Sequence, residues 1–506
     1  MASTAPSQSS APTSAPTATN GPGKPAAGGG GASGPFSIGA GLADSPAVSA
    51  AIQQIIGEVK ARSAQITDVR PPREGSKETY DAYLKRAADV RGRGLWFPYM
   101  GSGVGNGALV EMADGSVKWD MTCGIGVHFF GHSDADLTAA AVRGAVSDTV
   151  MQGNLQSNLD AYEFCETFMK EAKKNSRLEY IYLSTSGCMA NENAVKVCYQ
   201  KHAPASRVIA FKDCFMGRSV TMSQIGDSAA NRIGLPLTTL VDYMPFYDAL
   251  AAERMGRTKY IDMSVMHLRQ YVERYPKQHA CFIFELVQGE GGFNVAPREY
   301  FKELMEFCKA NSIAVWDDEI QSWGRTGRMF AYEDLDLGNY VDVFCVGKMT
   351  QVCATLFTKD YNPGPGLLSG TFIGGGVPFA VGKRVVERLR DSNYYGDNGV
   401  ILKNHRAFVE QVRALAAKHP AWFPKSAEVA DISGGRGGMM RFTPFGGLKD
   451  KVMNACKAMF DEGVITFYCG HGPYHIRMLP PLGVFNESDW PRVFACVEKG
   501  LAKVAG

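Results

Sequence analysis

The chain has 506 residues, of which 45% are hydrophobic and 21% are charged, and its formal net charge is +2. These values are typical of a soluble globular protein that is long enough for two or three domains. The near balance of charge gives no indication of binding to nucleic acid or to an acidic membrane surface, and no apolar run is long enough to span a bilayer.

Residues 1–35 are expected to form a disordered, low-complexity tail. They are mostly Ala, Ser, Thr, Pro and Gly, and Lys24 is their only charged side chain. Such a segment buries too little apolar surface to order itself. It has neither the apolar centre of a secretory signal nor the arginines of a mitochondrial presequence. The twelve cysteines form no CxxC pair. We therefore expect reduced, mostly buried thiols and a cytoplasmic location.

The first ordered elements are predicted from apolar spacing and turn residues. Helical spacing over residues 45–64 predicts an amphipathic helix. Asp114-Gly115 predicts a hairpin within residues 108–122. The glycine cluster over residues 101–107 has no apolar strand before it and no helix after it, so we interpret it as a loop and not as a nucleotide-binding turn. The apolar face of the first helix is expected to carry Ile52, Ile55, Ile56 and Val59.

From Tyr180 onward, short apolar runs alternate with longer helical segments. This alternation predicts an α/β fold with a mainly parallel sheet covered by helices, followed by a smaller α+β domain. We expect residues 36–110 to contribute to the small domain, residues 111–376 to form the large domain and residues 377–506 to form the rest of the small one. The predicted strands are Tyr180–Leu183, Val208–Phe211, Ala280–Phe284, Ile313–Trp316 and Val341–Val346, and the clearest helices are Ala190–Gln200 and Tyr300–Ala310.

Two of these strands end at residues that carry chemistry. The strand ending at Trp316 is followed by Asp317, Asp318 and Glu319, and the strand ending at Val346 is followed by Gly347 and Lys348. The carboxyl ends of parallel strands meet at the same edge of a sheet, where ligands of open α/β sheets bind. A carboxylate and an amine at that edge suit pyridoxal phosphate, since the amine can form a Schiff base and the carboxylate can hold the pyridine nitrogen protonated.

Two further strand ends are candidates for the same site. Small residues at 184–187 follow a strand and precede a helix that begins near Ala190. The free N–H groups of a helix N-terminus suit a phosphate, although a plain strand-to-helix turn has the same pattern. Glu285 follows another apolar run, where a carboxylate needs a cationic or hydrogen-bonding partner. A structural ion pair or a helix cap is an equally good interpretation of Glu285.

Metal binding is the weaker interpretation of the histidines and of the acidic run. The pairs His128/His132 and His471/His475 have i, i+4 spacing, but neither lies in a convincing helical pattern or in HExxH. Consecutive strand residues point to opposite faces, so Asp317, Asp318 and Glu319 cannot easily share one ion. We expect two of these three acids to be solvated or to cap a helix.

Six motifs in this order resemble the class III aminotransferases of fold type I, the ornithine, acetylornithine and 4-aminobutyrate type. The resemblance extends from about Leu95 to Ala505. It implies pyridoxal 5'-phosphate as cofactor, and small amino acids and 2-oxo acids as partners. It also implies a homodimer and leaves open whether two such dimers form a tetramer. The motifs are SGCMANENAVK, ELVQGEGG, DDEIQSWGRTG, VGK, SGTFIGGG and HIRMLPPL.

The resemblance implies a role for each matching residue. Lys348 matches the Schiff-base lysine, Asp318 the partner of the pyridine nitrogen and Gln321 the glutamine near the phenolic oxygen. For the phosphate and the ring, the matching residues are Gly187 and Cys188 as the phosphate-binding pair, Phe215 as the aromatic residue that stacks on the ring, and Thr371 as the residue that reaches the phosphate of the neighbouring subunit.

The resemblance also implies how substrates bind. Arg477 matches the arginine that binds the α-carboxylate, and Glu285 matches the acid that can pair with it. A guanidinium suits bidentate recognition of a carboxylate. When Glu285 pairs with Arg477, a donor can enter by its terminal amine; when the pair opens, 2-oxoglutarate can bind. The implied function is transfer of the terminal amino group of an ω-amino or diamino acid, such as lysine, ornithine or 4-aminobutyrate, to 2-oxoglutarate.

The sequence departs from the family pattern in the pocket. Met189 stands where the family usually has Glu, Met216 where it has His, and residues 373–378 replace the common GGNP. Local strings at 347–353 and 156–162 are most similar to lysine 6-aminotransferases, although Ser369 and Gly370 do not match that branch. The alternatives are an aminomutase, decarboxylase or racemase on the same fold, since small pocket differences set the chemistry, and a non-catalytic or metal-dependent protein.

Overall fold

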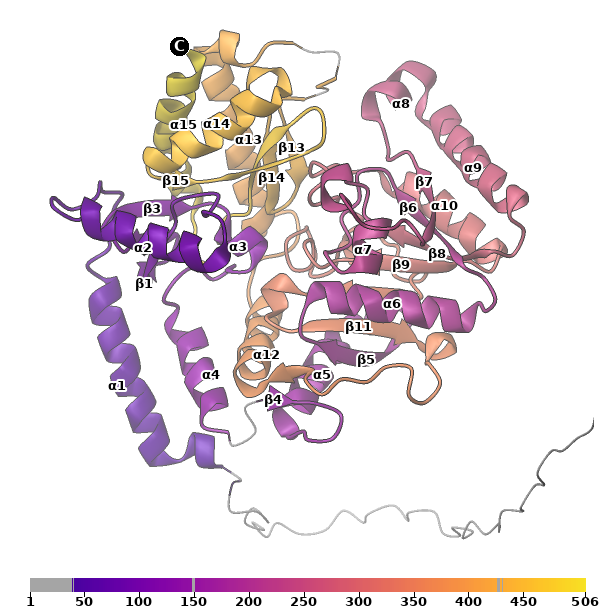
Figure 1. Ribbon diagram of the computed structural model, residues 1–506, viewed down its shortest axis with the longest axis horizontal. Coiled ribbons are helices and arrows are strands. Elements are labelled where there is room, and N and C mark those ends of the chain that lie inside the picture. The colour runs from indigo at the N-terminus through magenta and orange to yellow at the C-terminus, as the bar shows by residue number, and fades with distance from the viewer. Residues whose placement is uncertain (1–38, 40, 148–150, 426–427, 430) are drawn as a thin grey trace, which may run out of the picture. The chain divides into compact units, whose positions relative to one another are not determined.

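The computed structural model describes residue 39 and residues 41–147, 151–425, 428–429 and 431–506. The tail predicted over residues 1–35 lies outside these ranges. Residues 43–506 form one compact unit (Figure 1), to which the following description applies. The boundaries predicted within it, after residues 35, 110 and 376, stay predictions.

The centre of the unit is a seven-stranded, mainly parallel sheet, as the sequence predicts. β11 is antiparallel to both of its neighbours, and the other neighbouring pairs are parallel. In spatial order the strands are β5 (Leu178–Ser184), β11 (Cys353–Thr358), β10 (Val343–Val346), β9 (Ala314–Asp318), β8 (His279–Phe284), β6 (Arg207–Phe211) and β7 (Leu240–Met244).

The sheet is buried on both faces because alternate side chains of each strand enter different apolar clusters. On β9, Ala314 and Trp316 enter one cluster and Val315 enters the other. Helices α6 (Gly187–Lys201) and α7 (Val220–Ile225) contribute to the first cluster, and α6 contacts β8, β9, β10 and β11 (Figure 1). The opposite face packs against α5 (Leu159–Ala172), α10 (Arg298–Ala310) and α12 (Gly376–Asp391).

Two four-stranded sheets lie outside the central one. The first joins distant parts of the chain, because β15 (Val464–Ile465) pairs in parallel with β3 (Val117–Asp120), next to β2 (Leu109–Met112) and β1 (Gly101–Asn106). The second has the order β13 (Ser433–Arg436), β14 (Met439–Phe442), β17 (His475–Met478) and β16 (Phe467–Cys469). Three helices complete this part of the chain: α13 (Val400–Lys418), α14 (Lys449–Asp461) and α15 (Trp490–Ala505).

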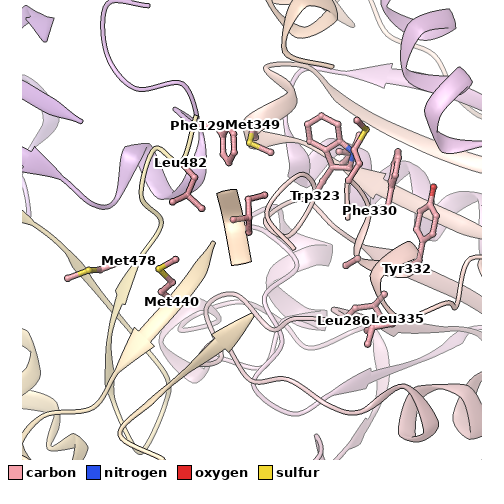
Figure 2. Packing of buried hydrophobic residues seen from close by; sticks show 14 of the residues in the cluster. Phe129, Leu286, Trp323, Phe330, Tyr332, Leu335, Met349, Met440, Met478 and Leu482 are labelled. Carbon is pink, nitrogen blue, oxygen red and sulfur yellow. The ribbon is translucent and has the colours of Figure 1, made fainter. Parts of the chain in front are cut away.

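The main apolar cluster reaches from the central sheet to these C-terminal strands. Figure 2 shows Met440 and Met478 side by side on β14 and β17, and both are fully buried. The same view shows Trp323, Phe330 and Tyr332 gathered near the loop that follows β9, where the rings of Phe330 and Tyr332 stack with centroids 4.8 Å apart. The segment after β9 therefore has a well-packed support.

The remaining elements lie around these sheets. Among the described residues no helix is long and apolar enough to cross a membrane. The other elements are α1 (Pro46–Ser63), α2 (Lys77–Arg91), α3 (Cys123–Gly126), α4 (Ala135–Ala145), α8 (Ala249–Met255), α9 (Arg257–Arg274), α11 (Ala331–Asp334), β4 (Met151–Gln152), β12 (Gly374–Gly375) and the 3-10 helices η1 (Leu42–Asp44), η2 (Ala229–Asn231), η3 (Lys348–Thr350), η4 (Lys359–Tyr361), η5 (Pro420–Trp422), η6 (Phe445–Gly447) and η7 (Glu487–Asp489).

Three details differ from the sequence predictions. The glycine cluster predicted to be a loop is strand β1, which pairs with β2. The strands β7 and β11 were not predicted. The first helix, α1, forms as predicted. Ile52 and Ile56 are buried, but Ile55 is 44% exposed, so the neighbouring elements cover only part of the predicted apolar face. The predicted hairpin around Asp114-Gly115 is confirmed by the pairing of β2 with β3.

Candidate active site

Lys348 stands where β10 ends, at the carboxyl edge of the central sheet. Gly347 precedes it, and Lys348 itself adopts a φ of 54°, a strained value for a residue other than glycine. Burial lowers the pKa of its amine to about 8; Asp318 and Glu285 act in the opposite direction, and Arg477 lowers the pKa further. A neutral, nucleophilic amine is therefore available close to neutral pH.

Asp318 reaches the same edge from the neighbouring strand β9. It follows Ala314 and Trp316 in the period-2 pattern and so points to the α6 face of the sheet. Asn191 of α6 donates a hydrogen bond from Nδ2 to its Oδ2 at 2.7 Å, and the Ile320 N–H donates to its Oδ1 at 3.0 Å. Burial raises the pKa of Asp318, and these two hydrogen bonds and the charge of Lys348 oppose that rise. A cationic ligand atom would hold this carboxylate ionised.

The two acids beside Asp318 are buried, and the prediction that two of the three acids are solvated or capping is only partly right. Asp317 and Glu319 both have no exposed surface. Glu319 does cap a helix, because the N–H groups of Ala331 and Tyr332 at the start of α11 donate to it at 2.8 and 2.9 Å. Burial and the nearby Glu319 raise the pKa of Asp317 well above its usual value, so its carboxyl is held uncharged. Within the described ranges no group of His, Cys, Asp and Glu side chains could hold a metal ion.

Gly187 and Cys188 form the start of α6, directly after β5. The hydroxyl of Ser186 accepts the N–H of Met189 and so caps the helix, while the N–H groups of Gly187 and Cys188 have no acceptor among the described residues. The segment at Ser219 lies against this start of the helix, since the Ser219 N–H donates to Cys188 Sγ at 3.1 Å. Free N–H groups and the positive end of the helix dipole suit a phosphate group.

Phe215 and Glu285 are joined by the backbone. The N–H of Phe215 donates to Glu285 Oε2 at 3.0 Å, and the N–H of Gly289 donates to Glu285 Oε1 at 3.1 Å. Burial raises the pKa of Glu285 to about 8, and the charge of Asp318 raises it further. Gln321 packs against Gly289 and has a buried Oε1 without a hydrogen-bond donor among the described residues. Glu285 therefore positions the aromatic loop, and Gln321 has bonding capacity left for a ligand.

Arg477 lies on β17 and is 3% exposed. Its guanidinium carbon is 5.3 Å from the ring centroid of Phe467 and 5.9 Å from that of Phe293. Nε and Nη1 have no hydrogen-bond acceptor among the described residues. No ion pair joins Arg477 to Glu285 within that part of the chain, so the pairing that the family resemblance implies is not formed in this structure. A buried, unpaired guanidinium is costly unless an anion binds it.

Thr371 is not brought to the other residues. Thr371 is exposed. Two backbone hydrogen bonds join its segment to the β4 region: the Asn154 N–H donates to the Gly370 carbonyl at 3.1 Å, and the Ile373 N–H donates to the Gln152 carbonyl at 2.7 Å. No contact in the described structure links it to Lys348, Asp318 or α6. Its predicted role toward a neighbouring subunit stays a prediction.

Two residues of the site were not singled out from the sequence. Asn191 donates both to Asp318 and, at 2.9 Å, to the carbonyl of Met216, and so ties β9 to the loop of Phe215. The sequence feature that could have identified Asn191 is its position one helical turn after Gly187 in the same motif, which places both residues on one face of the helix. Arg218 places its guanidinium 5.6 Å from the Phe215 ring centroid. Of the three departures from the family pattern, Met216 is buried, Met189 is 45% exposed, and residues 373–378 include strand β12 and the start of α12.

These residues fit pyridoxal 5'-phosphate. The start of α6 offers free N–H groups to a phosphate, the buried Asp318 carboxylate suits a protonated ring nitrogen, and Lys348 offers an amine of lowered pKa to an aldehyde. The unsatisfied Oε1 of Gln321 suits a hydroxyl group. The half-exposed ring of Phe215 suits stacking on a planar ring. All five features lie at the carboxyl edge of one sheet, where its strands end.

Gly217→Ala is expected to weaken cofactor binding about tenfold. Gly217 has a φ of 127°, and an added Cβ would stand 2.6 Å from Cys188 Sγ. The new side chain would strain its own backbone and push on the start of α6, at a cost of about 1–3 kcal/mol. Titration of cofactor-free protein with pyridoxal 5'-phosphate measures the change. Gly57→Ala is the control, since no atom lies within 4 Å of its added Cβ; equal affinities of the two variants would contradict the expectation.

Comparison with protein families gives one match over most of the chain. The model described as aminotransferase class-III matches residues 102–492. The diaminobutyrate–2-oxoglutarate transaminase of Marinococcus halophilus is 25% identical over 403 residues, which cover 77% of this chain and 87% of that relative. The mitochondrial acetylornithine aminotransferase of Eremothecium gossypii is 28% identical over 319 residues, which cover 60% of this chain and 70% of that relative.

Comparison with solved structures gives the same fold. The lysine aminotransferase of M. tuberculosis in its internal aldimine form superposes with a TM-score of 0.71 at 22% identity, covering 83% of this chain and 99% of that one. An aminotransferase of Bacillus anthracis superposes with a TM-score of 0.72 at 19% identity, covering 85% of this chain and all of that one. The fold predicted from the sequence is thus confirmed.

Proposed function

Because this chain belongs to the class-III aminotransferases, we propose that it transfers the terminal amino group of an ω-amino or diamino acid to 2-oxoglutarate. The chain is an aminotransferase and its cofactor is pyridoxal 5'-phosphate. The choice of donor and acceptor is the proposal. Diaminobutyrate, acetylornithine and lysine appear in the names of its relatives and structural neighbours, and 2-oxoglutarate appears in the name of one of them.

The cofactor supplies an aldehyde that takes up the amino group and a protonated ring that withdraws electrons from the reacting carbon. Lys348 would hold the cofactor through its amine, and its Nζ would also carry the proton that transamination moves, because its pKa of about 8 suits a base near neutral pH. Asp318 would keep the ring nitrogen of the cofactor protonated. Asn191 orients Asp318, and Glu285 holds the loop of Phe215 through its backbone.

The observation that carries the substrate proposal is the state of Arg477. Its guanidinium is almost fully buried, two of its nitrogen atoms have no acceptor among the described residues, and its charge lowers the pKa of Lys348. A substrate carboxylate at Arg477 would thus lie within electrostatic range of the reacting amine. Every amino acid and 2-oxo acid carries such a carboxylate, and a planar guanidinium binds it with two hydrogen bonds.

The proposal includes a homodimer that works in the cytoplasm. Thr371 is exposed next to Phe372, which is 57% exposed. Leu155, Leu159 and Tyr162 add exposed apolar surface nearby, at 98%, 73% and 57%. Apolar surface of this kind often marks an interface. Light scattering of the purified protein tests the assembly: the mass of a single 54.8 kDa chain at micromolar concentration would contradict the dimer.

The experiment that tests the function follows the visible absorbance of the holoenzyme as single amino donors are added without acceptor. Lysine, ornithine, 2,4-diaminobutyrate, 4-aminobutyrate, β-alanine and alanine form the series. We expect one terminal-amine donor to bleach the band of the lysine-bound cofactor and 2-oxoglutarate to restore it. Bleaching by alanine alone, or no recovery with 2-oxoglutarate, would contradict the proposed donor or acceptor.

Arg477→Lys is expected to raise the KM for 2-oxoglutarate about 10- to 100-fold with a smaller change in kcat. Lysine keeps the charge but loses the planar pair of donors, at a cost of about 1.4–2.8 kcal/mol in carboxylate binding. Initial rates over a range of 2-oxoglutarate concentrations measure the change. Arg492→Lys on α15, whose guanidinium instead pairs with Asp68 at 2.8 Å, is the matched control. An unchanged KM in Arg477→Lys would place the carboxylate elsewhere.

A further inference from the structure

A second arginine, Arg441, stands directly opposite Arg477 in the C-terminal sheet and takes no part in the roles given above. β14 and β17 pair in antiparallel register, with Arg441 opposite Arg477 and Met440 opposite Met478. The two methionines belong to the main apolar cluster (Figure 2). Because successive strand residues point to opposite faces, the two arginines share the other face of the sheet as a cross-strand pair.

The two guanidinium groups lean toward opposite edges of this sheet. The guanidinium carbon of Arg477 is 5.3 Å from the ring centroid of Phe467 on β16. Arg441 instead lies over Gly434 on β13, since a Cβ added at Gly434 would stand 3.0 Å from its Cζ, Nε and Nη2. The glycine thus leaves room for this guanidinium. The two side chains start from neighbouring strands and diverge, so they offer two separate positions for negative charge on one face.

Two uncharged side chains fix the direction of the Arg441 guanidinium. Its Nη1 is 3.2 Å from His475 Nδ1 and 3.4 Å from Thr443 Oγ1, and the Thr443 hydroxyl is 2.7 Å from the same His475 nitrogen. Burial and then the charge of Arg441 lower the pKa of His475 to about 2, so its imidazole is neutral. These partners orient the guanidinium without neutralising its charge. His475, weighed from its spacing as a metal ligand, instead supports an arginine.

Both arginines keep N–H groups without an acceptor among the described residues, at Nε in Arg441 and at Nε and Nη1 in Arg477. Burial lowers the pKa of Arg441, and the charges of Cys469 and Asp431 act in the opposite direction. Like charges directly opposite on neighbouring strands destabilise a sheet, so the pair costs folding free energy while no anion is bound. Negative charge at both positions would remove this cost and use the free N–H groups.

We infer that Arg441 binds the second carboxylate of the substrate and so selects dicarboxylates such as 2-oxoglutarate over 2-oxo acids with one carboxylate, such as pyruvate. One carboxylate of the substrate lies at Arg477 and the other at the free Nε edge of Arg441. A planar guanidinium suits each of them. The inference rests on the proposed role of Arg477 and adds a residue that determines specificity for the acceptor.

Arg218 is the other arginine beside the site, and the environment of Arg441 favours Arg441 over it. Arg218 is exposed, and its guanidinium carbon is 5.6 Å from the Phe215 ring centroid. Arg441 is partly buried and held in place by His475 and Thr443. A charged hydrogen bond is stronger where water is excluded, and an arginine that is already oriented loses less side-chain entropy on binding.

The test measures binding of glutarate and of valerate to the holoenzyme by calorimetry. Both are five-carbon acids without an amine or a keto group, so neither reacts, and they differ by one carboxylate. We expect wild type to bind glutarate about tenfold more tightly than valerate. Arg441→Gln is expected to raise the dissociation constant of glutarate about tenfold and to leave that of valerate within about twofold. Arg441→Lys keeps a cation and should recover part of the glutarate affinity.

Other results would overturn the inference. Equal affinities of wild type for the two acids would do so, and so would an unchanged glutarate affinity in Arg441→Gln. An equal loss for both acids in that variant would mean that Arg441 acts only through the fold or through Arg477. A loss of glutarate affinity in Arg218→Gln alone would assign the second carboxylate to Arg218. Arg477→Lys should weaken both acids; if it binds both as tightly as wild type, the proposed role of Arg477 fails and the inference fails with it.

Discussion

Lys348→Ala is expected to lower kcat by about 10^4-fold or more, the largest effect of any single change in this protein. The variant removes the amine that holds the cofactor and that moves the proton, and no other lysine stands at the carboxyl edge between β9 and β10 in the described structure. Proton transfer by a positioned side chain alone contributes about 10^2- to 10^4-fold to a rate. A steady-state assay with the donor that the absorbance series identifies measures the loss.

A second measurement shows whether the loss has the expected cause. Borohydride treatment of wild type should fix the cofactor to the peptide that contains Lys348, and mass spectrometry should find no such adduct in Lys348→Ala. Lys170→Ala on α5, an exposed lysine, is the control and should keep full activity. Substantial turnover by Lys348→Ala, or an adduct on a different lysine, would refute the assignment of Lys348.

Asp318→Asn is expected to lower kcat about 10^3-fold. The amide cannot hold a proton on a ring nitrogen by charge, and buried groups that stabilise charge in a reaction contribute about 10^2- to 10^3-fold each. Asp318 also raises the pKa of Lys348, which is about 8 in wild type. In the cofactor-free variant the amine should therefore titrate below this value. The pH dependence of Lys348 acylation by acetic anhydride, followed by peptide mass spectrometry, measures the shift.

Asp317→Asn is the matched control for this prediction. Asp317 is the preceding residue of the same strand, equally buried, but its side chain points to the opposite face and is held uncharged. Its conversion to an amide of similar shape should leave kcat within about threefold of wild type and leave the acylation profile unchanged. An equal loss of activity in both variants would mean that disturbance of β9 and not the charge of Asp318 causes the effect.

The placement of Lys348 and Asp318 could be predicted from the sequence because it depends on local pattern. Each follows a short apolar run, and parallel strands bring their carboxyl ends together whatever the rest of the chain does. The turn from β5 into α6 was predictable for the same reason, although the helix begins at Gly187 and not near Ala190.

The parts that were not predicted depend on contacts between distant segments. β1 has the sequence GSGVGN, which carries no apolar alternation, and it is a strand only because β2 supplies hydrogen bonds. The acids Asp317 and Glu319 were expected to be solvated or to cap a helix, but both are fully buried, and only Glu319 accepts N–H groups from the start of α11. His471 lies 2.9 Å from Asp213 and 3.7 Å from Glu290, and nothing in any one of these three distant segments indicates the other two.

Helix α6 has one consequence for which molecules this protein can accept as cofactor. Its first turn offers N–H groups at Gly187, and Asn191, four residues later, fixes the carboxylate of Asp318. The two contact points are thus spaced by about 6 Å of a rigid helix, at 1.5 Å per residue. Under the roles proposed for Gly187 and Asp318, this spacing sets the distance that a cofactor would have to span between its phosphate and its ring nitrogen. We expect analogues with a lengthened phosphate arm or a displaced ring nitrogen to reach one of these two contact points and not the other.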